Sequence, residues 1–546
     1  MDSVRGKRIR QLLEDYVGRP THTATRLENN NQAFFEQYFT GMPYFRERPG
    51  QWGLYPIPHD PLGRQVPWGL LLGGGRDTIV LIHHSDTVDT QDYGSFQPLA
   101  HQPRALTQAY AKQPAGLDAE TRQDLQGGGW LFGRGVADMK GGAAIHLALF
   151  EEYASHMDLR GNLLLLSLPD EENLSAGMRA AVGLMVELQQ AHQLNYVLLL
   201  DVEPQERTEE TLMRVYDGSV GKLMPVCYAR GKVAHVGQVF QGLNPVHLLS
   251  EIVTATELSP DFLEQAGNTK TPPPVWLNLR DRKEVYDVSL PPAAAGYMSV
   301  LTLGRQAQDI MAQLHTICQQ AFDRVIDRTT ASYRRYTGDE KARLPWQARV
   351  MTYEDARQLA LRDAGEACQA DLASFEPQVA RRVAQGELSL AEAAFLLIER
   401  TLSHLKDKDP LVVLAMAPPY YPHVSAHKLA GKGQAVAGLI RHLEDFAQQA
   451  LGSQLYVENY YTGISDLSYG MFEGSRENTD FIQANMLLWG EMYSIPFDEI
   501  RGLAIPVFNI GPWGKDFHKA TERVNLTDLC QRVPEMVNAA IRHLLA

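Results

Sequence analysis

Cysteine is scarce in this sequence. The 546 residues include four cysteines, and no two of them form a Cys-x-x-Cys pair: Cys227, Cys318, Cys368 and Cys530. This spacing fits neither a thiolate zinc site nor a recognisable disulfide framework, so we predict buried or incidental thiols. The ligands of any bound metal are therefore expected among histidine, aspartate and glutamate.

Positive charge and long apolar runs are also in short supply. With 51 Lys and Arg against 65 Asp and Glu, the formal net charge is −14, which argues against a general nucleic-acid-binding protein. No run approaches the roughly 20 apolar residues of a membrane span, and no apolar signal core follows the basic residues near Met1. We expect a cytoplasmic protein that binds neither nucleic acid nor membrane and whose partner is a small molecule or short peptide.

Phosphate-binding motifs are missing from the most glycine-rich stretch, WLFGRGVADMKGG at residues 130–142. It contains neither GxGxxG nor GxxxxGK[ST], so a nucleotide site is not predicted there. The glycines instead permit tight backbone geometry around Asp138, just before an apolar helix predicted over residues 143–154. The polar stretch before it, from residue 89 to about residue 129, is too long for a simple connector and predicts an active-site rim or a flexible excursion.

Four apolar runs each end in polar residues suited to binding a ligand. In an open α/β sheet, ligands bind beyond the carboxyl ends of the strands, so this repeated pattern indicates a site. The runs and the groups that follow them are residues 78–82 before His83, His84 and Asp86; 162–168 before Asp170, Glu171 and Glu172; 196–200 before Asp201 and Glu203; and 504–510 before His518.

The motifs HHSDTV, GRGVADMKGG, LPDEE, the EP of LLDVEP and GPWGKDFHKATERV occur in this order between residues 83 and 524. Together they resemble the co-catalytic zinc metallopeptidase family that includes carboxypeptidase G, the aminoacylases, succinyl-diaminopimelate desuccinylase and acetylornithine deacetylase. The resemblance implies a zinc exopeptidase-type α/β/α catalytic domain with a mixed central sheet, interrupted by an α+β lid or dimerisation domain.

The resemblance also implies a site with two zinc ions, for which Co²⁺ or Mn²⁺ are alternatives. In that family a carboxylate bridges both metals, a histidine and an acidic residue complete each metal's shell, and an unligated glutamate is the general base. A further Asp orients the first His. The matching residues are His84, Asp138, Glu172, Glu203 and His518 as metal ligands, Glu171 as general base and Asp86 as the orienting residue.

Several of these assignments have alternatives. Asp201 competes with Glu203, because strand residues two apart point the same way; the EP match favours Glu203. Glu171 and Glu172 also fit a solvated loop pair. His83 stands where the family more often has Gly, and we interpret it as a structural or rim residue.

A second domain is predicted from the middle of the chain. The family's GKxAHxG motif matches residues 231–237, so the resemblance implies that His235 stabilises the tetrahedral oxyanion, often in a neighbouring subunit of a homodimer. Asn244 matches a substrate-contacting position. In the later stretch YTGISDLSY, Ser465 and Asp466 match a turn that lines the substrate pocket, although the Arg that often follows it is absent.

These observations predict a discontinuous catalytic domain at residues 1–212 and 409–546, a lid at 213–333 and a helical extension of the lid at 334–408. The expected function is hydrolysis of an amide bond in a small N-acyl amino acid or short peptide, and the resemblance implies a role in arginine or related amino-acid catabolism. A dipeptidase or carboxypeptidase with the same site is the closest alternative. From another class, a catalytically silent binding protein would keep the fold but would be expected to have lost some of these ligands.

Overall fold

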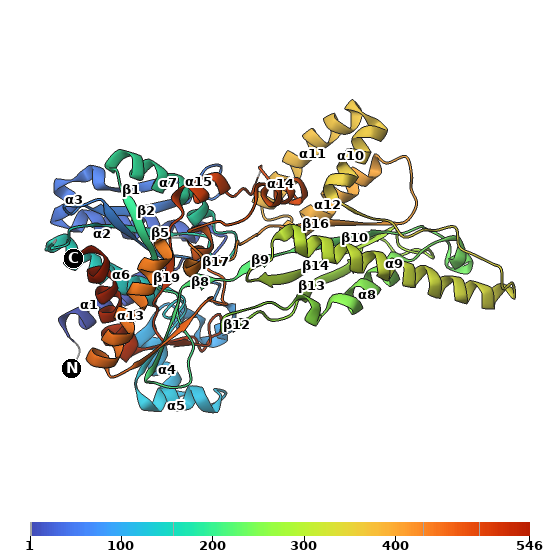
Figure 1. Ribbon diagram of the computed structural model, residues 1–546. Helices are drawn as coiled ribbons and strands as arrows, with labels where there is room; N and C mark the ends of the chain where they lie inside the picture. The colour runs from blue at the N-terminus through green and yellow to red at the C-terminus, as the bar shows by residue number, and fades with distance from the viewer. Residues whose placement is uncertain (1–2, 157, 430, 491) are drawn as a thin grey trace. The chain divides into compact units, whose positions relative to one another are not determined.

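The computed structural model describes residues 3–156, 158–429, 431–490 and 492–546. The chain forms two compact units (Figure 1). The first comprises Met1–Val220, His423–Glu473 and Pro496–Ala546, and the second comprises Gly221–Pro422 and Gly474–Ile495. Within the described residues, none of the helices combines the length and the apolar character needed to cross a bilayer.

The first unit is built on an eight-stranded mixed sheet, which confirms the predicted α/β class. Its inner strands are parallel: β3 lies between β5 and β6 and runs in the same direction as both. Every residue of β5 is buried, as is typical of an aliphatic strand covered on both faces. In spatial order the strands are β1 (Trp52–Pro56), β2 (Gln65–Leu71), β5 (Asn162–Leu168), β3 (Asp77–His84), β6 (Asn195–Asp201), β19 (Val507–Asn509), β7 (Leu212–Tyr216) and β18 (Gln454–Glu458).

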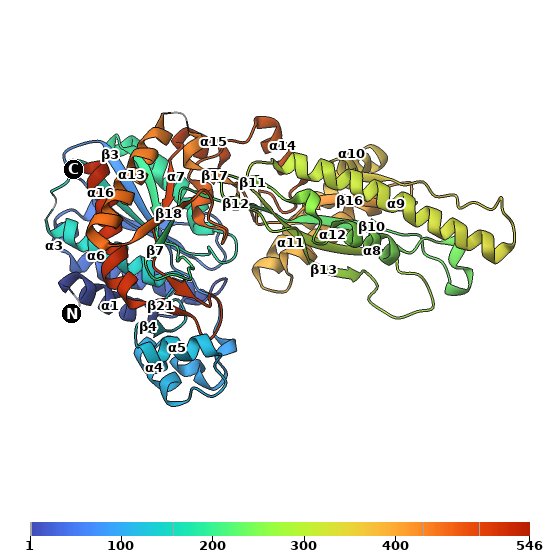
Figure 2. The same ribbon diagram turned by 60° about the horizontal axis from the view of Figure 1, so that its bottom comes forward.

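Helices cover both faces of this sheet (Figure 2). Alternate strand residues such as Ile79 and Leu81 enter one large core, whereas α7 (Ala176–His192) contacts β1, β2 and β5 outside that core. The predicted helix after Asp138 is α6, which begins slightly earlier, at Lys140. The helices that contribute to the large core are α1 (Val4–Val17), α2 (Asn30–Gly41), α3 (Pro43–Glu47), α6 (Lys140–Ser155), α13 (Lys432–Leu451) and α16 (Val533–Leu545); α15 (Phe497–Leu503) contacts α7.

The polar stretch at residues 89–129 is folded into helices and has a small core of its own. Leu106, Tyr110 and Trp130 are buried there with Phe132 and Trp513. Its elements are α4 (Pro103–Lys112) and α5 (Ala119–Gly127), followed by β4 (Trp130–Phe132), which belongs to a three-stranded sheet with β21 (Arg523–Asn525) and β20 (Gly514–Lys515). The excursion therefore packs beside the hairpin that carries His518.

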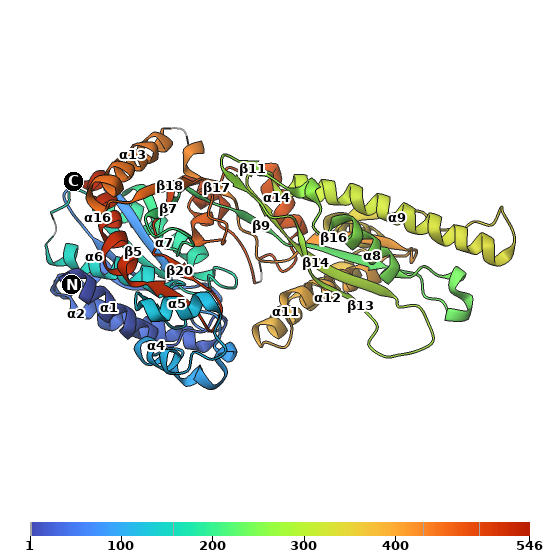
Figure 3. The ribbon, with the colours of Figure 1, turned by 90° about the horizontal axis from the view of Figure 1, so that it is seen from below.

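The second unit has a six-stranded sheet with helices on both faces (Figure 3). Helices α8 (Pro245–Thr256) and α9 (Ala307–Thr337) pack together, and the opposite core is formed with α10 (Tyr353–Ala364), α11 (Glu366–Ala384) and α12 (Leu390–Ser403). The strands are β13 (Val275–Asp281), β14 (Ala293–Thr302), β10 (Pro225–Arg230), β16 (Leu411–Met416) and β15 (Val350–Thr352), with β9 (Gly221–Leu223) paired to β14; α14 (Arg476–Asn485) also belongs to this unit.

The boundaries predicted from the sequence are corrected by strand pairing. We expected the return to the catalytic domain near Asp409, but β16 pairs antiparallel with β10, so the chain returns only at His423. The first boundary moves from residue 212 to Val220, because β7 pairs with β18 in the first unit. Helices α10, α11 and α12 cover the second unit's own sheet and do not form a separate extension.

Candidate metal centre

The carboxyl ends of three adjacent strands bring the candidate residues together. Strand β3 ends at His84, β5 is followed by Glu171 and Glu172, and β6 is followed by Glu203. Because β5, β3 and β6 are neighbours and parallel, their carboxyl ends lie at one edge of the sheet. The buried aliphatic strands β5, β3 and β6 thus place the polar side chains that follow them close together.

The Asp138 carboxylate lies between two imidazoles. Its Oδ1 is 2.9 Å from His84 Nε2, and its Oδ2 is 3.2 Å from His518 Nε2. His84 Nε2 is also 3.8 Å from Glu203 Oε1, and His518 Nε2 is 2.9 Å from Glu172 Oε1. The residues predicted as metal ligands therefore form two groups that share Asp138, one around each imidazole.

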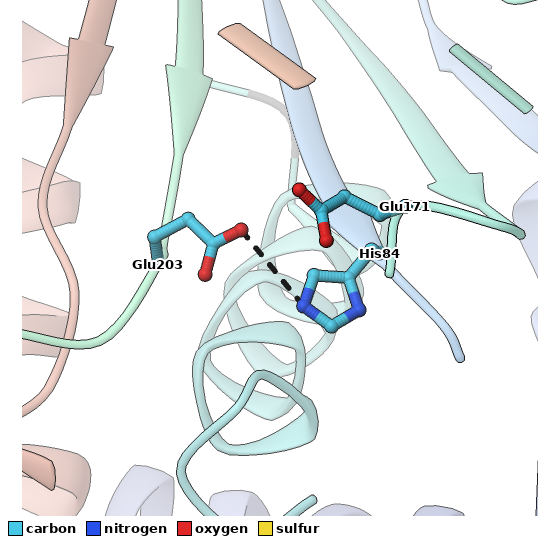
Figure 4. A group of neighbouring side chains, drawn as sticks. All are labelled: His84, Glu171 and Glu203. Carbon is cyan, nitrogen blue, oxygen red and sulfur yellow. Dashed lines mark ion pairs between the residues drawn. The ribbon is translucent and has the colours of Figure 1, made fainter. Parts of the chain in front are cut away.

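Two overlapping groups have ligand atoms within 4.8 Å of one another, one of His84, Glu171 and Glu203 and one of His84, Asp138 and Glu172. Figure 4 shows the first group: the Glu171 and Glu203 carboxylates both lie near the His84 ring, and a dashed line joins Glu203 to it. Imidazole and carboxylate donors suit zinc and related divalent ions. The donor set therefore fits the metals expected from the sequence.

Charge is concentrated strongly in this buried cluster. Burial opposes the charged form of His84, but Glu203 and Asp138 outweigh it and hold the pKa of that imidazole well above its usual range. Burial raises the pKa values of Glu171 and Glu203 well above the usual value. Hydrogen bonds to Asp138 and Glu172 raise the pKa of His518 to about 11. Without a metal, protons on these imidazoles and carboxylates offset the negative charge that divalent cations would neutralise. Protons and metal ions therefore compete for the same side chains.

The two acidic candidates after β6 have different surroundings. Asp201 accepts hydrogen bonds at both oxygens, from Ser465 Oγ at 2.8 Å and from the Val202 amide at 2.9 Å. Glu203, in contrast, directs a carboxylate oxygen toward His84. The geometry favours Glu203 over Asp201 as a ligand, in agreement with the EP motif.

Asp86 supports the acidic turn after β5 more directly than it supports His84. Its Oδ1 and Oδ2 accept hydrogen bonds from the amides of Glu171 and Glu172, each at 3.1 Å. The nearest approach of its carboxylate to His84 Nδ1 is 3.7 Å, whereas its backbone carbonyl oxygen is 3.0 Å from that nitrogen. The His84 ring is therefore oriented by the main chain of Asp86, and the carboxylate holds the turn.

Two further buried residues, Glu522 and Arg134, hold the Asp138 loop, and neither was among the candidates predicted from the sequence. Glu522 Oε1 accepts hydrogen bonds from the Ala137 and Asp138 amides at 3.1 and 3.2 Å, and its Oε2 pairs with Arg134 at 2.9 Å. Burial raises the pKa of Glu522 to about 7. Arg134 lies within the motif GRGVADMKGG and Glu522 within HKATERV, so their positions in these motifs could have indicated a role at the site.

The predicted substrate residues of the first unit are buried. Ser465 donates to Asp201, and its Oγ also accepts a hydrogen bond from the Leu467 amide at 3.1 Å. Asp466 is 2% exposed, and burial raises the pKa of its carboxyl to about 8. Its charge contributes to the raised pKa of Glu171, so Asp466 lies near the candidate general base.

His235 and Asn244 belong to the second unit, whereas the other candidate residues belong to the first. His235 is exposed, and its Nδ1 accepts a hydrogen bond from the Gly237 amide at 3.1 Å. Asn244 caps α8 by accepting from the Val246 amide at 3.0 Å. His83 is fully buried, and its ring stacks on Phe35 at a centroid distance of 5.8 Å, so it is a core residue.

The fold and the site define an α/β protein with a candidate metal centre at the carboxyl edge of its sheet. A family model described as Peptidase family M20/M25/M40 matches residues 113–541. The chain therefore belongs to this peptidase family, as the motifs predicted, and is a hydrolase that acts on peptide or amide bonds.

Two Bacillus proteins and one solved structure are similar to this chain over nearly its whole length. Protein YqjN of Bacillus subtilis is 32% identical over 512 residues, which are 92% of this chain and 90% of that protein. Protein RocB of the same organism is 28% identical over 551 residues, covering 99% and 95%. The M20 family metallo-carboxypeptidase Sso-CP2 of Sulfolobus solfataricus superposes with a TM-score of 0.53 at 9% identity, covering 98% of this chain and 99% of that one, which supports the shared fold.

Proposed function

We propose that this chain hydrolyses an amide bond in a small N-acyl amino acid or short peptide, using two zinc ions and Glu171 as general base. The observation that carries the proposal is the Asp138 carboxylate between the His84 and His518 imidazoles, with Glu171 in the same cluster. A carboxylate shared in this way, with one further acidic group near each imidazole, suits a pair of divalent cations.

Five residues would hold the two metals. His84, Glu203 and Asp138 form one half-site, and His518, Glu172 and Asp138 form the other. Bound zinc would supply Lewis acidity and would lower the pKa of water toward neutrality. Co²⁺ and Mn²⁺ suit the same donors.

Glu171 has the surroundings expected of a general base. Its backbone is held by Asp86, and burial raises the pKa of its carboxyl, which favours accepting a proton. As a water oxygen bonds to the amide carbon, Glu171 takes one of the water's protons. It then passes this proton to the leaving nitrogen as the carbon–nitrogen bond breaks, so that an acid and an amine are released.

The substrate is proposed at the level of class. A place in arginine or related amino-acid catabolism in the cytoplasm is proposed from the resemblance of the motifs to an arginine utilisation protein, and the chain is 28% identical to Protein RocB. A dipeptidase or carboxypeptidase is the alternative with the same site. A catalytically silent binding protein is disfavoured, because every expected ligand and the general base are present.

We also propose that His235 acts at the site of a second copy of this chain. His235 lies among exposed apolar side chains, and the two segments that carry them are joined by backbone hydrogen bonds from Val236 to Val288 and from Leu290 to Ala234. A cluster of this kind suits an interface, and we call it the tip surface: Val233, Val236, Val239, Val285, Tyr286 and Val288, which are 38–88% exposed.

The experiment that tests the function is metal content per chain, measured by plasma mass spectrometry on protein purified without chelators or affinity metal, before and after zinc supplementation. About two ions per chain, reduced in His84→Ala, would support the proposal and justify a screen of N-acyl amino acids and dipeptides. No specific metal after supplementation would reject the two-zinc mechanism.

A further inference from the structure

The turn that carries His518 has a strained backbone. Residues 516–521, which we call the His518 turn, lie in the connection between β20 and β21. Asp516 and His518 have φ values of 55° and 62°, in the left-handed region that residues with a Cβ rarely adopt. Such conformations persist only where surrounding contacts hold them.

His518 itself has little packing to hold it, since its side chain is 50% exposed. A metal ligand must nevertheless stay within roughly 0.5 Å of its productive position. The ring contacts of His518 are with Asp138 and Glu172, which are themselves proposed metal ligands, so contacts that position this histidine independently of the metal have to act on the turn.

The helical excursion at residues 103–127 contacts the His518 turn and its flanking strands through side chains of both α4 and α5. Tyr110 of α4 donates a hydrogen bond through its hydroxyl to the Ala520 carbonyl at 2.7 Å. Asp124 of α5 accepts hydrogen bonds at Oδ2 from Arg523 Nε at 2.7 Å and from Lys515 Nζ at 2.9 Å. The two cations come from β21 and β20, one on each side of the turn.

Arg523 transmits the second contact into the turn. Its guanidinium donates to Asp516 Oδ2 and to the Thr521 carbonyl, and Thr521 Oγ1 donates to Asp516 Oδ2 at 2.9 Å. Arg523 is almost completely buried, with its guanidinium 5.7 Å from the Trp130 ring centroid. Asp124, Arg523 and Asp516 thus form a continuous charged chain that ends two residues before His518.

We propose that the excursion is a positioning element for His518, with Asp124 acting through Arg523 and Tyr110 acting on Ala520. This inference rests on the proposed function, because it gives the turn the task of holding a metal ligand. The small core of α4 and α5 is apolar and does not include Asp124, so the excursion can fold without that carboxylate. Asp124 is therefore available for a role in the neighbouring turn.

The test compares Asp124→Ala with Glu120→Gln in the full-length protein. Glu120 is a matched control because it lies on the same helix and also pairs with Lys515, at 2.7 Å, whereas the ion pairs of Arg523 are with Asp124 and Asp516. The first measurement is amide hydrogen exchange of residues 516–521 with and without chelator. The second is retention of zinc in competition with a chromophoric chelator, and the third is the Tm of the metal-free protein.

We expect exchange in the His518 turn of Asp124→Ala to increase at least about tenfold while exchange in α6 stays unchanged. One of two zinc ions should be held about 10–100-fold more weakly. Tyr110→Phe should change both quantities in the same direction by less, and Glu120→Gln should match the wild type. The metal-free Tm of Asp124→Ala should fall slightly below that of the control, because the buried Arg523 loses one carboxylate partner but keeps Asp516.

Unchanged exchange in the turn would overturn the positioning role, and so would equal weakening of both ions together with a metal-free Tm far below that of the control. A wild-type protein that binds no zinc would reject the proposed function. In that case the exchange measurement on the metal-free protein would still decide whether Asp124 holds the turn.

Discussion

The carboxylate of Asp86 lies beneath the backbone of Glu171, with Oδ1 3.1 Å from the Glu171 amide nitrogen. Its other oxygen accepts the next amide, that of Glu172. Glu522 makes the same kind of contact with the consecutive amides of Ala137 and Asp138. Two buried carboxylates thus fix the two loops that carry most of the acidic candidates, each by binding a pair of neighbouring N–H groups.

Asp86→Asn should disturb the acidic turn without removing any proposed ligand. An amide side chain has one acceptor oxygen, so it would leave one of the two backbone N–H groups without a partner, at a cost of about 1–3 kcal/mol. We expect a lower Tm and a loss of zinc affinity or activity of about 10–100-fold. Thermal unfolding and zinc competition would measure both effects; wild-type zinc affinity with normal stability would contradict this view of Asp86.

Glu171→Gln and Glu172→Gln should separate catalysis from metal binding. Without the base, turnover of a substrate identified by the screen should fall about 10²–10⁴-fold in Glu171→Gln, with both metals retained. Glu172→Gln should lose metal as well, because this carboxylate is 2.9 Å from His518. Metal content and kcat measured on the same preparations provide the check, and equal metal loss in both variants would overturn the division of roles.

Glu28 predicts a pH dependence of stability. Arg64 pairs with Glu28, Asp60 and Asp170 at 2.5–2.8 Å, and burial, with the nearby Asp86 charge, raises the pKa of Glu28 from 4.5 to about 9. The folded protein thus keeps a proton that the unfolded chain releases above about pH 4.5. The stability from this proton is complete below that pH and is lost as the pH rises toward 9.

Glu28→Gln removes this titration while keeping an oxygen for Arg64. Its stability should match the wild type near about pH 5 and exceed it by about 1–3 kcal/mol near about pH 8. Denaturant unfolding at both pH values would measure the difference, with exposed Glu36→Gln as control. A stability difference that does not change with pH would show that Glu28 is ionised in the folded protein.

The tip surface predicts a second copy of the chain as its partner. Val236 and Tyr286 are 51% and 88% exposed. The double variant Val236→Asp, Tyr286→Asp should convert a dimer into monomers, and these monomers should be no less stable to heat than the wild-type monomer. Val4→Asp is a suitable control, because Val4 is 89% exposed and lies in the first unit. Sedimentation velocity would decide, and a wild-type protein that is monomeric at high micromolar concentration would reject this partner.

Much of the first unit could be predicted from local sequence. Aliphatic runs such as NLLLLSL predict strands buried on both faces, and the acidic or imidazole groups at their ends predict a site at one edge of a sheet. The motif order added the family, and the family match confirms it. The pairing of strands was harder to predict. Residues 411–416 have the pattern of a strand, but no local sequence pattern indicates that this strand, β16, pairs with β10 in the second unit.

The sequence by itself determined the fold class, the family and the set of acidic and histidine side chains at the strand ends, because periodicity and short motifs are local properties of the chain. Only the tertiary structure decided which partner each carboxylate oxygen binds. The Asp86 carboxylate accepts hydrogen bonds from the amides of Glu171 and Glu172 rather than from His84, and Asp201 accepts one from Ser465. Asp124 binds Arg523, which lies nearly four hundred residues away in the sequence. These relationships depend on contacts between segments distant along the chain, which no local pattern records.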